Sequence, residues 1–218
     1  MNNNNFFATL RAAFPDTLDA VAVETDQGLA YSWRDLERAT AMMANLLESL
    51  KLPAGARVAA QLEESVEAVM LYWATLRAGC VFLPLNTACQ SLEIAHLLGH
   101  AQPAVVVCNR QKFGWISKTA FKAGTQNVFT LNPDRTGSLL ERAAHCSDQH
   151  TLAVKQTDDL AAVLYTCGTT DCSKSTTVSH GDMPSYAQQV LKDHWGWQSP
   201  EKNGADKYMY LYGLVHST

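Results

Sequence analysis

Residues 104–108 read AVVVC, a run of apolar side chains without a charge among them. A strand with one face in the core alternates apolar and polar residues, whereas a strand covered on both faces does not. Pro103 ends the helical pattern that precedes the run. The run therefore predicts a strand inside a parallel sheet, with helices packed on both of its faces.

Similar short runs recur on either side of this one, and segments with helical spacing separate them. The other expected strands are 58–62, 80–83, 127–131 and 160–165, with a further short strand at 21–23. The expected helices begin at Ser32 and Ser65, cover 91–100 and about 111–124, and include a short one at 138–144. Strands that alternate with helices predict an α/β fold, with a largely parallel sheet flanked by helices.

The spacing also predicts which side chains of two later helices face the core. The expected inward residues are Leu92, Ala95 and Leu98 in the helix at 91–100, and Phe113, Ile116 and Ala120 in the helix at 111–124.

Composition and charge exclude several classes of protein. Hydrophobic residues make up 47% of the 218 positions and charged residues 17%, so the chain has enough apolar material for a core and is not intrinsically disordered. A net charge of −4 argues against a strongly basic nucleic-acid binder. No apolar run approaches the roughly 18 residues of a membrane-spanning helix. We expect no nucleic-acid partner and no membrane span.

The cysteines and the N-terminus indicate a cytoplasmic protein. The six cysteines form no C-x-x-C pair, which argues against a zinc knuckle or a thioredoxin-type site. The first residues carry neither the basic segment nor the long apolar segment of a secretory signal. Residues 1–5, which include four asparagines, are expected to be disordered. We expect reduced thiols in a cytoplasmic chain.

One segment has the composition of a phosphate-binding loop. The strand expected at 160–165 leads directly into TCGTTDCSKS at 166–175. A phosphate group needs converging hydrogen-bond donors and a cation, which hydroxyl groups, backbone N–H groups and Lys174 can supply. The segment does not fit the P-loop pattern G-x-x-x-x-G-K-[ST]. Clusters of Ser, Thr and Gly are also typical of ordinary turns, so composition alone leaves both interpretations open.

The residue order in this segment resembles a known signature. The pattern YTxGTTxxSK at 165–174 resembles the phosphate loop of the AMP-forming acyl-CoA synthetases, the acyl-adenylate-forming superfamily, and His180 follows at the usual distance. The segments LRAGCVFLPLN at 76–86 and YSWRDL at 31–36 are similar to other parts of that family. Within the family, residues 57–61, 65–68 and 83–88 are most similar to malonyl-CoA synthetases.

The resemblance implies a reaction, its cofactors and the residues that bind them. Family members join a carboxylate to ATP, release pyrophosphate, and then transfer the acyl group from AMP to coenzyme A. It implies ATP, Mg²⁺ and coenzyme A as cofactors, and a small-molecule carboxylate, with malonate as the candidate acid. The implied ATP contacts are Thr166, Gly168, Thr169, Thr170 and Lys174. The resemblance assigns no catalytic residue or metal ligand within these 218 residues.

The resemblance also sets an expectation for domain organisation. It implies that residues 1–218 form an incomplete N-terminal AMP-binding domain, without the C-terminal lid domain that carries the family's catalytic lysine. The family's ribose-binding aspartate and adenine-contacting segment are likewise not found after Ser199. Whether the chain is itself an enzyme stays open, and by itself it is expected to be inactive.

Three positions of the loop depart from the family pattern, namely Cys167, Asp171 and Ser175. Asp171 matters most because its carboxylate would repel phosphate. At an effective dielectric constant of about 20, two unit charges about 4 Å apart interact by about 4 kcal/mol. The side chain of Asp171 can also point outward or face magnesium. An alternative function is therefore a truncated, non-catalytic remnant or an interaction module with a degenerate phosphate loop.

The remaining histidines give no metal-binding pattern. His96 and His100 lie four residues apart on one expected helix, but no third ligand is evident. We interpret these two, together with His145, His150, His194 and His216, as solvated surface side chains.

Overall fold

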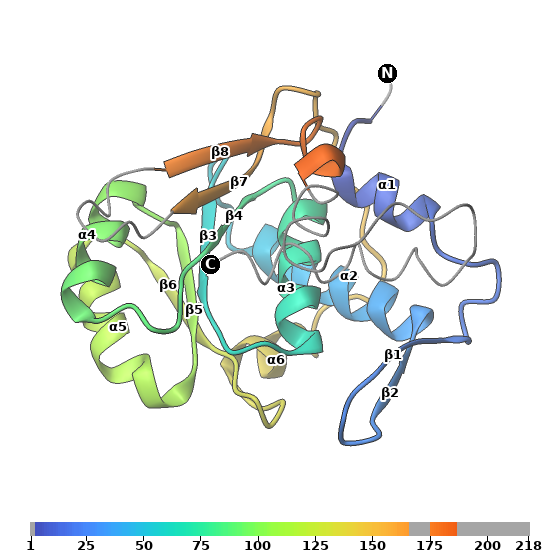
Figure 1. The fold of residues 1–218 in the computed structure, drawn as a ribbon, viewed down its shortest axis with the longest axis horizontal. Helices are drawn as coiled ribbons and strands as arrows, with labels where there is room; N and C mark the ends of the chain where they lie inside the picture. The colour runs from blue at the N-terminus through green and yellow to red at the C-terminus, as the bar shows by residue number, and fades with distance from the viewer. Residues whose placement is uncertain (1–2, 166–174, 187–218) are drawn as a thin grey trace.

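The computed structural model describes residues 3–165 and 175–186, and Figure 1 shows their arrangement. The helices are α1 (Phe6–Ala12), α2 (Trp33–Ser49), α3 (Val66–Arg77), α4 (Ser91–Ala101), α5 (Arg110–Lys122) and α6 (Ser138–Ala143). The strands are β1 (Val21–Glu24), β2 (Ala30–Ser32), β3 (Arg57–Gln61), β4 (Val81–Pro84), β5 (Val105–Cys108), β6 (Asn127–Thr130), β7 (Leu160–Tyr165) and β8 (Ser175–Ser179).

A six-stranded sheet with the order β6-β5-β3-β4-β7-β8 forms the centre of the molecule. Its first five strands in that order are mutually parallel, and β8 pairs antiparallel with β7 at one edge. The five strands predicted from the sequence are confirmed, whereas β8 was not predicted. Strands β1 and β2 form a separate antiparallel pair, so the short strand predicted at 21–23 lies outside the main sheet.

Helices cover both faces of the sheet, as the run at 104–108 predicts. Figure 1 shows α4 and α5 on one face and α1, α2 and α3 on the other. Successive residues of β5 divide between the two sides, because Val105 and Val107 belong to the core under α2 and α3, and Val106 and Cys108 to the core under α4 and α5. All four are fully buried, which explains why this strand contains no polar residue.

Helix α3 is the most deeply buried helix of the described fold, since each of its residues is buried. The side chain of Ser65 caps its first turn by accepting a hydrogen bond from the backbone N–H of Ala68. Gly79 follows its last turn with a φ of 72°, the left-handed conformation that glycine adopts without strain. The predicted start and end of this helix are therefore confirmed.

The predicted core faces of two helices need correction. In α4, Leu92 is 86% exposed and Ala95 is also exposed, while the buried residues are Ile94, Leu97, Leu98 and Ala101. The buried set follows the i, i+3, i+4, i+7 spacing of a helix face, which the predicted set did not. In α5, Ile116 and Ala120 are buried as predicted, but Phe113 is 37% exposed.

The expectation of disorder at residues 1–5 is wrong for Asn3, Asn4 and Asn5. Asn5 is fully buried and caps α1, and its Nδ2 donates to the backbone oxygens of Leu76 and Ala153 at 2.8 and 3.0 Å. The Asn3 side chain also donates to the Ala153 oxygen. The side-chain amides of Asn3 and Asn5 donate to backbone carbonyls from distant parts of the chain, and Asn4 is held by its backbone N–H, which donates to the oxygen of Lys155 at 2.9 Å.

Candidate functional site

The predicted phosphate loop falls between the last two strands of the sheet. Its five candidate residues, Thr166, Gly168, Thr169, Thr170 and Lys174, lie outside the described residues, as does Asp171. The structure describes both flanks. Tyr165, the last residue of β7, pairs with Ser175, the first residue of β8. Residues 166–174 therefore begin and end at neighbouring positions on two hydrogen-bonded strands.

The upstream flank is held by a contact with helix α4. The hydroxyl oxygen of Tyr165 lies 2.7 Å from Nδ1 of His100, and the two rings meet edge to face at 88°. Burial raises the pKa of Tyr165, and the positive charge of Arg57 partly opposes this effect. His100 was interpreted as a solvated histidine, but its ring is hydrogen-bonded to Tyr165, the residue that precedes the predicted loop.

The downstream flank ends at a buried histidine. His180 follows β8 and is 2% exposed, and its Nδ1 accepts a hydrogen bond from the backbone N–H of Phe6 at 3.1 Å. Because Nδ1 accepts, the ring is neutral and its proton sits on Nε2. Burial, with a smaller effect from the charge of Lys155, lowers the pKa of His180 to about 4. The family resemblance pointed to this position, but its link to α1 was not foreseen.

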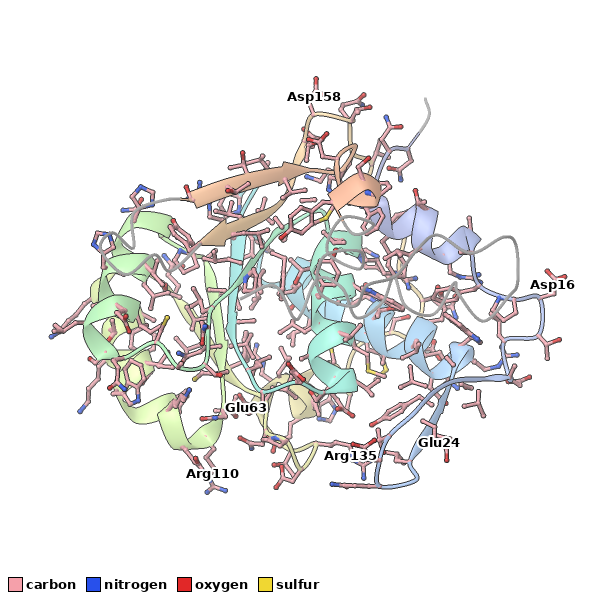
Figure 2. All side chains as sticks on the ribbon, viewed as in Figure 1. Asp16, Glu24, Glu63, Arg110, Arg135 and Asp158 are labelled. Atoms are coloured by element: carbon pink, nitrogen blue, oxygen red, sulfur yellow. The ribbon has the colours of Figure 1, made fainter. Side chains whose placement is uncertain are left out.

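A cavity of about 380 Å³ opens at the carboxyl ends of β3 and β4. In open sheets of parallel strands, ligands commonly bind at this edge. The lining residues are Ala60, Leu62, Glu63, Glu64, Ala68, Phe82, Pro84, Leu85, Asn86 and Thr87. Figure 2 shows Glu63 at the same edge of the molecule as Arg110, which follows the end of β5. The lining combines apolar side chains with polar surface that includes the carboxylates of Glu63 and Glu64, so the cavity itself disfavours an anionic ligand.

Two side chains from outside the cavity fix its polar wall. Gln61 is 1% exposed, and its Nε2 donates to the backbone oxygens of Asn86 and Cys89 at 2.9 and 3.2 Å. Nζ of Lys112 donates to the backbone oxygen of Thr87 at 2.6 Å. The segment after β4 is thus held from both sides. The sequence offered one signal for this arrangement, a glutamine that directly follows the apolar residues 58–60 of β3.

The described residues offer no cluster of His, Cys, Asp and Glu able to hold a metal ion. Burial raises the pKa of the Cys80 and Cys108 thiols to about 11 and about 12, so both thiols stay protonated at neutral pH. His150 was interpreted as solvated, but its side chain is 3% exposed, and burial lowers its pKa.

Within residues 3–165 and 175–186, no helix combines the length and the apolar character needed to span a bilayer.

Comparison with solved structures supports the malonyl-CoA synthetase likeness of the sequence. The apo structure of MatB from Rhodopseudomonas palustris, a malonyl-CoA synthetase, is 41% identical, with a TM-score of 0.80 over 90% of this chain and 38% of MatB. The ATP-bound structure of the same protein is 38% identical, with a TM-score of 0.82 over 98% of this chain and 43% of MatB.

Curated relatives include ligases that act on other acids. The L-proline–[L-prolyl-carrier protein] ligase of Pseudomonas fluorescens is 29% identical over 72% of this chain and 31% of its own length. The medium-chain fatty-acid–CoA ligase of Escherichia coli is 26% identical over 92% of this chain and 36% of its own length. The chain thus spans about a third of the length of these two relatives.

The family model described as AMP-binding enzyme matches residues 10–218. The mostly parallel sheet with helices on both faces is the fold that the MatB structures share with this chain. Since the family model covers nearly the whole sequence, the chain belongs to the AMP-binding enzyme family.

Proposed function

We propose that this chain is the phosphate-binding part of an AMP-forming acyl-CoA ligase whose acid substrate is malonate. Sequence identity supports malonate as the acid, because it is 38–41% with MatB and only 26–29% with the ligases for a medium-chain fatty acid and for proline. The reaction would join malonate to ATP with release of pyrophosphate, and coenzyme A would then displace AMP to give malonyl-CoA. We propose that this reaction takes place in the cytoplasm.

In this proposal Thr166, Gly168, Thr169, Thr170 and Lys174 contact the β- and γ-phosphates of ATP together with Mg²⁺. The observation that carries it is the pairing of Tyr165 with Ser175. A short connection between two paired strand ends can turn several backbone N–H groups and hydroxyls toward one anion. The ammonium group of Lys174 would offset the negative charge that such a site collects. The cavity with Glu63 and Glu64 at its rim would lie outside this anion site.

An alternative function is an interaction module or a non-catalytic remnant that does not bind ATP. Asp171 favours it, because this position carries a carboxylate in a segment proposed to bind phosphates. The two functions differ in one measurable property, the affinity of the chain for Mg-ATP.

Calorimetric titration of the purified chain with Mg-ATP distinguishes them. The proposal predicts saturable binding that Lys174→Ala weakens about tenfold or more, because the substitution removes the cation. Lys118→Ala, which removes an exposed lysine of α5, is the matched control and should bind like the wild type. Malonate should strengthen Mg-ATP binding more than succinate does, if malonate is the acid. A folded chain with no detectable affinity would favour the alternative function.

A further inference from the structure

The contact between His100 and Tyr165 lies outside the segment proposed to bind ATP. Tyr165 is buried, whereas His100 lies at an exposed position in the last turn of α4. The hydrogen bond of 2.7 Å joins Nδ1 of His100 to the hydroxyl oxygen of Tyr165, and the ring centroids are 5.9 Å apart. A residue of α4 thereby holds the side chain of the last residue before position 166.

Arg57 ties this helix end to the sheet. Its Nη1, at the start of β3, donates to the backbone oxygen of Ala101, the residue after His100, at 2.5 Å. The same guanidinium acts electrostatically on Tyr165. Three elements, β3, α4 and β7, therefore meet at this point. The end of α4 has little freedom to shift relative to the strand that carries Tyr165.

The pairing of Tyr165 with Ser175 extends this constraint to both flanks of residues 166–174. Ser175 is exposed and lies on an edge strand whose first three residues are all exposed. The edge strand therefore contributes little packing of its own at this point, and β7 supplies its fixed neighbour. A change in the position of Tyr165 would displace both ends of the segment together.

We infer that His100 is a positioning residue for the phosphate-binding segment, acting through the hydroxyl group of Tyr165. The inference rests on the proposed function, because it assigns His100 a role in binding that same anion. His100 contacts no ligand. It fixes the strand end from which the donors for the phosphates are presented. Since binding requires donors that are placed before the ligand arrives, a looser strand end lowers affinity even when the fold is intact.

A double-mutant cycle on Mg-ATP affinity tests the inference. His100→Leu and Tyr165→Phe should each weaken binding about three- to tenfold, the effect of one hydrogen bond. The double variant should be no weaker than either single variant, because both remove the same contact. His100→Gln, which keeps a hydrogen-bonding side chain, should restore most of the affinity. His96→Leu, one turn earlier on the exposed face of α4, is the control and should bind like the wild type.

The outcomes separate this inference from the proposed function. If the wild type binds Mg-ATP and all variants bind equally well, the positioning role of His100 is wrong and the proposed function stands. If melting temperatures fall in the cycle while affinities stay equal, the contact stabilises the fold only, and the inference is again wrong. If the folded wild type does not bind Mg-ATP, the proposed function itself fails.

Discussion

The backbone N–H of Phe6 donates a hydrogen bond to Nδ1 of His180, 3.1 Å away, although the two residues are 174 positions apart in the sequence. The contact joins the first turn of α1 to the residue that follows β8. The backbone N–H of His180 in turn donates to the oxygen of Asp159, just before β7. A neutral imidazole thus connects the N-terminal helix to the strand pair that flanks residues 166–174.

This contact predicts a loss of stability in mild acid. The pKa of His180 is about 4 in the folded chain, against an ordinary value near 6.5, so the unfolded chain binds the proton first as pH falls. The contribution of His180 to the free energy of unfolding is fully present above about pH 6.5. It declines as pH falls toward about 4, by about 1.4 kcal/mol per pH unit and about 3 kcal/mol in total.

Urea unfolding at a series of pH values measures the effect. His180→Asn, whose side-chain oxygen can accept the bond from Phe6, should show a shallower decline between pH 6.5 and 4 than the wild type. His145→Asn, an exposed substitution, should follow the wild type. Parallel curves for the wild type and His180→Asn would mean that other groups cause the acid sensitivity.

Substitution of Asn5 should destabilise the fold strongly for a residue so near the N-terminus. Asn5→Ala removes the cap of α1, a buried hydrogen bond to Leu76 and a partly buried one to Ala153. We expect a loss of about 2–4 kcal/mol in the free energy of unfolding. Asn4→Ala is the matched control, because the Asn4 side chain is exposed, and it should cost less than about 0.5 kcal/mol. Equal effects of the two substitutions would contradict the described packing of the asparagines.

Gly79 should not tolerate a side chain, for two reasons that a control separates. Its φ is 72°, and a Cβ there would lie 2.8 Å from Cβ of Ala153. Gly28 has a similar φ of 76° with nothing within 4 Å of the same position. We expect Gly28→Ala to cost about 1 kcal/mol from backbone strain and Gly79→Ala about 2–4 kcal/mol from strain and the clash together. Chemical denaturation of both variants measures the difference, and equal costs would refute close packing at Gly79.

The sequence was informative where one local pattern determines a structure. The apolar run at 104–108 predicted a central strand, and Ser65 and Gly79 marked the ends of α3, because capping and positive φ depend on residues within one turn. Strand β8 was missed because STTVS carries a single apolar residue, which suits an exposed edge and gives no pattern of burial.

Besides strand β8, the sequence did not predict contacts between segments that lie far apart in the chain. The order of Asn5 depends on carbonyls of Leu76 and Ala153, and the hydrogen bond of His100 depends on Tyr165. No local rule relates such pairs. For the candidate site, the family resemblance pointed to residues 166–174, which stay a prediction, and to His180. It did not point to the contacts of His100 or Gln61, because their partners are set by the packing of α4 and β3.

The central claim is that residues 166–174 bind the phosphates of ATP, and the Mg-ATP affinity of Asp171→Gly tests it most directly. The substitution removes a negative charge from the segment and frees its backbone, so the account predicts an affinity at least about tenfold higher than that of the wild type, and a smaller gain at high salt. Lys174→Ala in the same background should abolish the gain. Asp158→Gly, at an exposed position before β7, is the control and should change nothing. An Asp171→Gly chain that is folded and binds Mg-ATP no better than the wild type would contradict the account.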